Sequence, residues 1–409
     1  MTAPAEQDDT PRCQPADRLP SLRAALLCDF LEEGWPSMDL IGEMLARFLG
    51  AGQGGDICAD LLRPRLRRRF SQVPFLGRGQ FLWNADRLVN RFSDYPRWLR
   101  QRIHDYDVFH VVDHSYSQLV HVLPPHRTVV TCHDLDTFRC LLEPDPQKRP
   151  KWFRTITRRI LEGLQKSAHV IAVSGATRDE LLRYGLLPPE RISVIPNGVH
   201  PSCSLQPDPP ADAEATKLLE GVLEFPLLLS VGSTLPRKRL DVLLRVFAAV
   251  RRELGTVYLV RVGGLAAEHW QLASQLGIAD GILALPFLKR EILAAVYRRA
   301  TLLLHTASAE GFGLPLIEAM ACGCPAVASD IPVLREVGGS AVAYCALGDV
   351  PGWKDTVVRL LSEKSQQPGA WQVRRQLALE HAARYSWADN AHATRRIYRK
   401  VVEEASSLV

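Results

Sequence analysis

A turn near residues 305–321 combines glycines, a proline and acidic residues in a pattern suited to binding an anion. Gly311 and Gly313 follow an expected strand, and Pro315 suits the first position of a helix, where its missing N–H would be unpaired in any case. Such a turn aims backbone N–H groups at an anion, and the helix dipole adds to their effect. We therefore expect a phosphate-binding turn at residues 313–316.

Two carboxylates border this turn. Glu318 lies in the first turn of the expected helix, and Glu310 lies in the loop before it. An ionised carboxylate only accepts hydrogen bonds, so Glu318 suits sugar hydroxyls better than phosphate. The alternative is a capped helix whose first turn carries a glutamate because the dipole favours it there. The pair indicates a site that takes a sugar beside an anion.

A basic pair, Arg237 and Lys238, comes just before a second expected helix. Cations oppose the dipole at the start of a helix, so the pair is better explained by an anionic ligand than by local structure. Fixed cations also stabilise the charge that develops when a phosphate group departs. His133 ends another expected strand and is either a hydrogen-bonding group of a site or a satisfied residue at the rim.

Short apolar runs alternate with helical patterns along the chain, which predicts parallel sheets covered by helices. Expected strands lie at 23–28, 108–112, 128–132, 169–173 and 192–195, and after a proline-rich break at 226–231, 257–262, 282–286, 301–305, 326–328 and 341–344. Expected helices lie at 38–49, 152–166, 178–184, 240–253, 268–276, 290–299, 315–321 and 387–404. Neither half carries the Gly-x-Gly-x-x-Gly fingerprint, which argues against a dehydrogenase.

These patterns predict an α/β protein with two Rossmann-like domains. The predicted parts are an N-terminal domain at 20–200, an interdomain linker at 201–224, a C-terminal domain at 225–384 and a long amphipathic helix at 385–409.

The spacing of Glu310 and Glu318 matches the Glu-x7-Glu motif of the retaining glycosyltransferases of family 4, which have the GT-B fold. Four further segments resemble that family in the same order along the chain. They are Val-Val-Thr-Cys-His-Asp-Leu at 129–135, Val-Ser at 173–174, Val-Ile-Pro-Asn-Gly-Val at 194–199 and the run 230–241 around Val-Gly-Ser-Thr-Leu-Pro-Arg-Lys. The resemblance covers about residues 105–345.

The resemblance implies a role for each matching residue. Glu318 would bind the ribose hydroxyls of a nucleotide sugar, Glu310 would hold the donor sugar, and His133 would face that sugar as a hydrogen-bond donor. Arg237 and Lys238 would neutralise the departing diphosphate. The remaining donor-side positions are Gly311, Phe312, Gly313 and Leu314, whose backbone would lie against the sugar and diphosphate, and Gly232 and Ser233 in the preceding glycine turn.

Two departures from the family pattern limit what can be carried over. Many members have an arginine directly after the glycine of the Val-Gly turn, where this chain has Ser233. The acceptor loop commonly has paired glycines, whereas this chain has only Gly34, followed by Trp35. We expect Gly34 and Trp35 on the acceptor side, with the acceptor itself left open.

The resemblance further implies a GT-B architecture, with the two domains facing across a cleft and the last helix crossing back to the first domain. The donor would be a UDP- or GDP-sugar in the C-terminal domain and the acceptor a saccharide or lipid-linked sugar in the N-terminal one. Transfer would retain the anomeric configuration and need no metal or other cofactor.

The charge and the cysteine content limit the classes of partner and the compartment that we expect for the protein. The 409 residues have a net charge of +5, too small a bias to argue for nucleic acid. Residues 61–110, however, hold 11 arginines against four aspartates. The densest part is a basic cluster at Arg63, Arg65, Arg67, Arg68 and Arg69, which is either a solvated face or a contact with anionic lipid. Nine cysteines without a Cys-x-x-Cys pair, and no apolar leader or span, predict a cytoplasmic protein, with peripheral membrane contact at the inner face as an option.

Three rival functions are weighed against this hypothesis. Asp105, Asp107, Asp134 and Asp136 form two Asp-x-Asp strings that suggest a metal-dependent transferase, but the basic pair already supplies the charge that a metal would. A phosphorylase of the same architecture would need a lysine-bound pyridoxal phosphate. A catalytically idle nucleotide-sugar-binding or scaffold protein of polysaccharide assembly is the main alternative.

Overall fold

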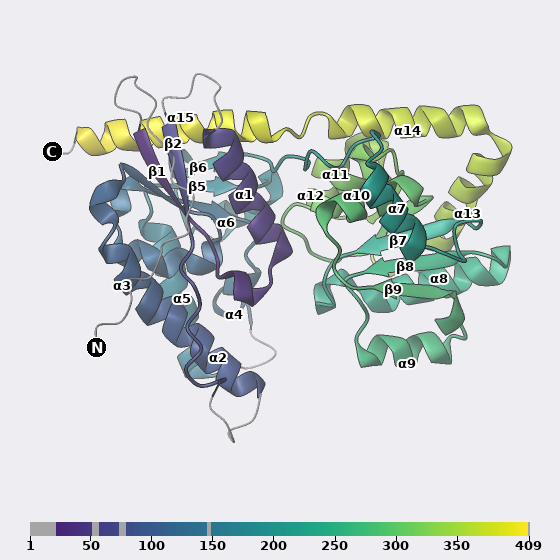
Figure 1. Ribbon diagram of the computed structural model, residues 1–409, viewed down its shortest axis with the longest axis horizontal. Helices are drawn as coiled ribbons and strands as arrows, with labels where there is room; N and C mark the ends of the chain where they lie inside the picture. Colours follow the sequence, from purple (N-terminus) through teal and green to yellow (C-terminus); the bar gives the residue numbers. More distant parts are fainter. Residues whose placement is uncertain (1–21, 51–56, 73–78, 145–148, 408–409) are drawn as a thin grey trace. The chain divides into compact units, whose positions relative to one another are not determined.

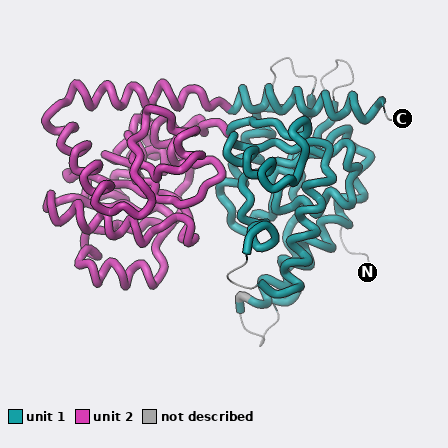
Figure 2. The backbone as a smooth tube through the Cα atoms, turned by 180° about the vertical axis from the view of Figure 1, so that it is seen from behind, with its two compact units in different colours: residues 1–196, 387–409 teal, residues 197–386 magenta. Residues whose placement is uncertain are grey.

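The computed structural model describes residues 22–50, 57–72, 79–144 and 149–407. The chain divides into two compact units, one of residues 1–196 and 387–409 and one of residues 197–386 (Figure 2). Each unit contains a six-stranded sheet in which all paired strands are parallel. The predicted α/β class with two Rossmann-like domains is therefore confirmed.

The sheet of the first unit has the strand order β2-β1-β3-β4-β5-β6. The strands are β1 Leu22–Leu27, β2 Ile57–Leu62, β3 Val108–Val111, β4 Thr128–Cys132, β5 His169–Ala172 and β6 Ile192–Val194. The edge strand β2 was not predicted, because Asp60 interrupts its apolar run. Asp60 is nevertheless buried, where it accepts hydrogen bonds from Arg23 and from the hydroxyl of Tyr106.

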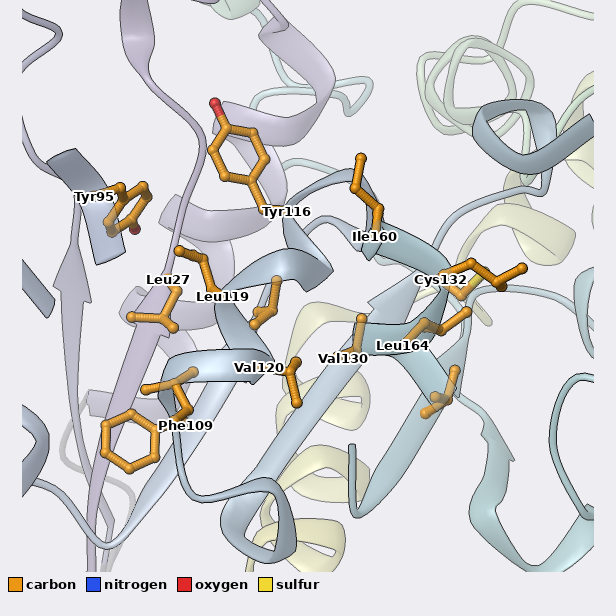
Figure 3. Close-up of a cluster of buried hydrophobic side chains, with 14 of the residues drawn as sticks. Leu27, Tyr95, Phe109, Tyr116, Leu119, Val120, Val130, Cys132, Ile160 and Leu164 are labelled. Carbon is orange, nitrogen blue, oxygen red and sulfur yellow. The ribbon is translucent and has the colours of Figure 1, made fainter. Parts of the chain in front are cut away.

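Helices pack on this sheet and enclose the core drawn in Figure 3, which includes Leu27, Phe109, Val130 and Leu164. The helices are α1 Pro36–Gly50, α2 Gln80–Val89, α3 Tyr95–Arg100, α4 Arg139–Leu142, α5 Lys151–Lys166 and α6 Gly175–Arg183. Burying such apolar side chains contributes about 25 cal/mol per Å².

The last helix, α15 Trp387–Ser406, belongs to the first unit and packs against α1 (Figure 1). Its Tyr398 is fully buried and forms a 2.6 Å hydrogen bond with Nδ1 of His110 in β3. Arg395 donates to the carbonyl of Phe48 near the end of α1, at 2.7 Å. The predicted return of the C-terminal helix to the first unit is thus present.

The sheet of the second unit has the order β12-β11-β10-β7-β8-β9. The strands are β7 Leu227–Val231, β8 Tyr258–Val262, β9 Ile282–Leu285, β10 Leu302–His305, β11 Ala326–Ser329 and β12 Ala343–Cys345. The helices are α7 Pro209–Leu218, α8 Leu240–Leu254, α9 Ala267–Gln275, α10 Arg290–Arg299, α11 Leu314–Ala321, α12 Pro332–Gly338, α13 Val350–Gln366 and α14 Pro368–Ala382. Within the described ranges, no helix is both long and apolar enough to cross a bilayer.

Residues 201–224, predicted as a linker, differ from that expectation because they contain α7. Asp208 caps this helix by accepting from the N–H of Ala211 at 3.2 Å. Two of the four prolines that suggested a linker, Pro209 and Pro210, stand in the first turn of α7, where proline is tolerated, and the other two precede the helix. Asp212 then pairs with Arg298 and Arg299 of α10, at 2.9 and 2.7 Å, so α7 packs as part of the second unit.

Candidate active site

The loop that follows β10 places Glu310 at the centre of an ionic cluster in the second unit. Its Oε2 accepts from Arg237 at 2.9 Å, and its Oε1 accepts from Nε2 of His305 at 2.9 Å and from Nζ of Lys238. Only 7% of the Glu310 side chain is exposed. Because an ionised carboxylate only accepts, Nε2 of His305 carries the proton. The structure thus brings the predicted glutamate and both predicted cations together.

Opposing effects act on the pKa of Glu310. Burial by itself raises it, but Lys238, His305 and Arg237 together lower it well below the ordinary value of 4.5. For His305 the effect of burial has the opposite sign: burial lowers its pKa, and the hydrogen bond to Glu310 raises it in part. Glu310 is therefore a carboxylate at neutral pH, and two cations are held beside it.

Two short contacts fix the loop after β10 against the turn that carries the cations. The N–H of Ser308 donates to the carbonyl of Arg237 at 2.8 Å, and the hydroxyl of Thr306 donates to the carbonyl of Lys238 at 3.0 Å. The cations lie on a single 3-10 turn, Pro236–Lys238. This pairing of backbone segments explains how residues more than seventy positions apart meet in one cluster.

Helix α11 starts as the sequence predicted. Gly313 caps it in the left-handed region, at φ 96°, and a Cβ there would lie 2.9 Å from a methyl group of Leu334. Pro315 has no N–H, and the N–H of Leu316 donates to the carbonyl of Gly313. Of the four residues 313–316, only Gly313 and Leu314 therefore keep a backbone N–H that a ligand can reach. Phe312 is buried, and its ring packs edge-on against that of Tyr385, with the centroids 5.6 Å apart.

Glu318 lies on α11 and is 9% exposed. Its Oε2 accepts from the hydroxyl of Tyr297 on α10 at 3.0 Å. Burial raises the pKa of Glu318, and the hydrogen bond from Tyr297 partly counteracts this. Tyr297 was not predicted as a site residue, and only its position on an expected helix near the motif hinted at it.

The glycine turn after β7 contains Gly232 and Ser233. Gly232 has φ 141°, a conformation that L side chains rarely adopt, and a Cβ at this position would be in van der Waals contact with the side chain of Lys238. Both carbonyls of the turn accept hydrogen bonds from the guanidinium of Arg261. This arginine, in β8, was missed by the sequence analysis.

His133 follows β4 in the first unit and is 8% exposed. Its Nε2 is 2.8 Å from the carbonyl of Val112, so that nitrogen carries the proton and donates to the backbone. Burial lowers the pKa of His133, which favours the neutral ring. The neutral ring then offers Nδ1, an acceptor, so the donor role expected for His133 would require a different tautomer or a protonated ring.

An acidic pair that the sequence analysis did not single out lies at the same edge of the first sheet. Asp29 follows β1 and Asp113 follows β3. Asp29 is 3% exposed, and its oxygens receive no hydrogen from any donor in the described part of the chain. Burial and the neighbouring Asp113 raise the pKa of Asp29 well above its usual value, so Asp29 is the member of the pair that keeps a proton. His114 flanks them, with Nδ1 3.3 Å from Oδ1 of Asp113.

The predicted acceptor-side residues lie near the start of α1. Gly34 has φ 69° and ends the short turn Leu31–Glu33, whose backbone reversal needs the left-handed conformation. Trp35 follows and is 41% exposed. Among the described residues, no group of three or more His, Cys, Asp or Glu side chains could hold a metal ion.

Comparison with known families agrees with this geometry. Residues 219–368 match the family model of glycosyl transferases group 1, and residues 53–202 match that of glycosyltransferase family 4. The chain belongs to the family 4-like glycosyltransferases. The two matched segments lie one in each unit, apart from a few residues at 197–202.

Curated relatives of this glycosyltransferase include two differently named transferases. It is 28% identical over 340 residues to O-antigen chain mannosyltransferase B of Escherichia coli, a match that covers 80% of the chain and 82% of the relative. It is 33% identical over 218 residues to D-inositol 3-phosphate glycosyltransferase of Mycolicibacterium smegmatis. That second match covers 50% of the chain and 48% of the relative, so it spans about half of the relative's length.

Solved structures support the fold of this glycosyltransferase. Sucrose-phosphate synthase from Thermosynechococcus elongatus superposes with a TM-score of 0.67 at 18% identity, over 94% of this chain and all of that one. Anabaena HepE, solved with UDP and glucose, superposes with a TM-score of 0.68 at 16% identity, over 93% of this chain and all of that one. The GT-B architecture predicted from the motifs is confirmed.

Proposed function

We propose that this protein is a retaining, metal-independent glycosyltransferase that moves a sugar from a nucleoside-diphosphate sugar to a saccharide or lipid-linked acceptor. The observation that carries the proposal is the cluster in which Glu310 holds Arg237, Lys238 and His305 beside a glycine turn. Cations in a buried setting are what a departing diphosphate needs, since they stabilise its negative charge without reorganising.

The donor-side roles follow from the contacts. Arg237 and Lys238 face the diphosphate, which competes with Glu310 for their charge when the donor binds. Glu310 is thereby freed to accept from hydroxyls of the donor sugar while His305 keeps its carboxylate in place. Glu318, held by Tyr297, accepts from the ribose hydroxyls. The backbone of Gly311, Phe312, Gly313 and Leu314 lines the sugar and diphosphate.

Retention fits attack on the face from which the diphosphate leaves. The bond between the anomeric carbon and the diphosphate oxygen breaks, and a bond from that carbon to the acceptor oxygen forms. The acceptor proton passes to the departing phosphate oxygen, so no protein nucleophile is required. His133 and the backbone near it would orient the donor sugar from the first unit.

Metal independence rests on the basic pair, which supplies the two positive charges that a divalent ion would otherwise bring. Turnover should be unchanged after dialysis against EDTA and on addition of Mg²⁺ or Mn²⁺. A strict requirement for either ion would overturn this part of the proposal.

The relatives support a hexose donor, since the names and titles of the proteins compared include a mannosyltransferase and a protein solved with UDP-glucose. We propose a UDP- or GDP-sugar as donor and a saccharide or lipid-linked acceptor that contacts the first unit near Gly34 and Trp35. The partly exposed indole of Trp35 suits a sugar ring, because aromatic faces pack against apolar sugar faces.

A peripheral membrane contact through the basic cluster is also proposed. Arg63 pairs with Asp39, and Arg69 pairs with Asp94, so part of its charge is neutralised within the unit. Arg68 of the cluster nevertheless lies over the ring of Trp83 on α2, and Phe81 of the same helix is 80% exposed. Arginines beside an exposed aromatic ring suit an anionic bilayer surface. Co-sedimentation with vesicles of phosphatidylglycerol should fall for Phe81→Ser and at high salt, and should be absent with neutral vesicles.

A thermal-shift panel of UDP, GDP and their sugars tests the function directly. A ligand present at about 100 times its dissociation constant adds about 2.7 kcal/mol of stability. Slow hydrolysis of the stabilising sugar nucleotide separates a transferase from an idle binding protein, which binds without turnover. Glu318→Ala and Lys238→Ala should each lower that turnover by orders of magnitude while the protein stays folded, and full activity in both would refute the site.

A further inference from the structure

Arg261 is a buried arginine in the sheet of the second unit, on the strand next to the edge strand β9. It lies in β8, directly opposite Ser230 of β7, and is only 1% exposed. Arginine is rarely buried unless it is paired with an acid, since taking a charge out of water costs several kcal/mol. The position therefore calls for an explanation.

Among the described residues, its hydrogen-bond acceptors are all backbone carbonyls at and near the glycine turn. Nη1 donates to the carbonyl of Ser230 at 3.2 Å and also to that of Val262. Nη2 donates to the carbonyls of Gly232 and Ser233, at 2.6 and 2.8 Å. One guanidinium thus ties the end of β7, the end of β8 and the turn together.

No carboxylate pairs with Arg261 among the described residues, and its Nε has no acceptor there. Burial lowers its pKa to about 10, so the group still carries its charge at neutral pH. A positive charge is therefore fixed beneath the turn without a counter-ion from the described part of the protein.

The orientation of the turn follows from these bonds. In a trans peptide, the C=O and the N–H point in opposite directions. Holding the carbonyls of Gly232 and Ser233 against Arg261 therefore turns the N–H groups of Ser233 and Thr234 away from it. Neither N–H has an acceptor within the described ranges. Successive N–H groups of this kind form an anion-binding nest.

The turn is also held from the neighbouring strand. A Cβ at Gly263, just after β8, would lie 1.9 Å from the carbonyl oxygen of Gly232, so the two turns are in direct contact. On the turn itself, the Lys238 side chain passes Gly232. Two cations therefore lie around Gly232: Arg261, which donates to its carbonyl, and Lys238, whose side chain would touch a Cβ placed there.

We propose that Arg261 is a positioning residue for the diphosphate of the donor: it orients the N–H groups of Ser233 and Thr234 toward the anion and adds a fixed positive charge beneath them. Arg261 does not touch the ligand itself. Its charge stands in for the arginine that many family members carry at the position of Ser233. This inference rests on the proposed function, because it assumes a diphosphate ligand.

The test compares ligands that share a base and differ in charge. Dissociation constants are measured by calorimetry and NMR titration for UDP, UMP and uridine, and for the guanosine series, with the full chain and with Arg261→Met. Loss of the charge and of the nest should weaken the diphosphate about tenfold, the monophosphate less and the nucleoside hardly at all. Arg261→Lys keeps the charge but not the four-carbonyl fork, so its loss should be intermediate.

Arg251→Met serves as the matched control. Arg251 lies in the last turn of α8 and pairs with Asp280, which precedes the amino end of β9, whereas the glycine turn follows the carboxyl end of β7. Loss of Arg251 should therefore leave all three affinities unchanged. If Arg261→Met does not fold, the lysine variant carries the test with the same ordering of ligands.

Equal losses for the diphosphate and the nucleoside would mean a purely structural role and overturn the proposal. Wild-type affinities in a folded Arg261→Met would overturn it as well. If the wild type itself binds neither diphosphate, the proposed function fails, which is a separate outcome from a failure of Arg261 alone.

Discussion

Tyr297 donates its hydroxyl hydrogen to Oε2 of Glu318 at 3.0 Å, and both side chains are buried. The bond links α10 to α11 and keeps the carboxylate of Glu318 in one orientation. It also stabilises the ionised form, which burial disfavours. The ionised carboxylate can then accept hydrogen bonds from hydroxyl groups of a ligand, because the hydrogen bond from Tyr297 already offsets part of the cost of burying its charge.

Tyr297→Phe should therefore raise the pKa of Glu318 further. Donor binding needs the ionised carboxylate and should therefore weaken several-fold at neutral pH. The pH below which donor affinity falls should also move to a higher value. An unsatisfied buried carboxylate costs about 1–3 kcal/mol, so the melting temperature should also fall. Calorimetric titration of the donor between pH 5 and 8 measures the shift. Tyr258→Phe, at a half-buried tyrosine of β8, should leave the pH profile unchanged.

Glu310→Gln should remove stability that depends on pH. The folded-state pKa of Glu310 lies below its ordinary 4.5, so its contribution is present above that pH and is lost as the pH falls. Urea unfolding should show the variant to be weakened at pH 7 by roughly 1–3 kcal/mol, with the difference shrinking toward pH 3. A constant difference at both pH values would contradict the assignment of Glu310 as the centre of the ionic cluster.

The elements of the second unit could largely be predicted from the sequence. The helix at 290–299 coincides with α10, and the expected strands differ from the observed ones by only a residue or two at their ends. Short buried strands that alternate with amphipathic helices leave little ambiguity. The helices α7, α12, α13 and α14 were missed. Of these, α14 buries only Trp371, Ala378 and Ala382, which is too few residues for a clear apolar face.

The candidate site could be predicted only in part. The glycines and charged residues of the motifs were found because each has a chemical reason that is local in sequence. The hydrogen bond from His305 to Glu310 was not predicted, because it depends on the loop 306–309 folding back onto the turn that contains Arg237. Arg261 was missed because alternation in a strand suggests an exposed position for a charge, whereas both faces of a doubly wound sheet are covered.

Asp29→Asn should change how the stability of the first unit depends on pH. The pKa of Asp29 is raised by burial and by Asp113, so the folded state holds a proton that the unfolded state releases, and stability is lost as the pH rises. Asparagine carries no such proton. The variant should match the wild type at pH 5 and exceed it at pH 8.5 in urea unfolding. Asp280→Asn, at an exposed pair, should show no gain at high pH.

Asp212→Ala tests whether α7 is an integral part of the second unit. The carboxylate of Asp212 joins α7 to Arg298 and Arg299. Burial by itself would raise its pKa, but the hydrogen bonds from the two arginines lower it to about 2. The contribution is present above the ordinary pKa of 3.8 and fades as the pH falls toward 2. At pH 7 the variant should lose about 1 kcal/mol of stability and become cleavable by protease near residues 209–218. Protease resistance equal to that of the wild type, with unchanged stability, would show that the helix does not depend on this pair. Asp241→Ala should give neither effect, because the carboxylate of Asp241 pairs with Arg239 only two residues away and joins no second helix within the described ranges.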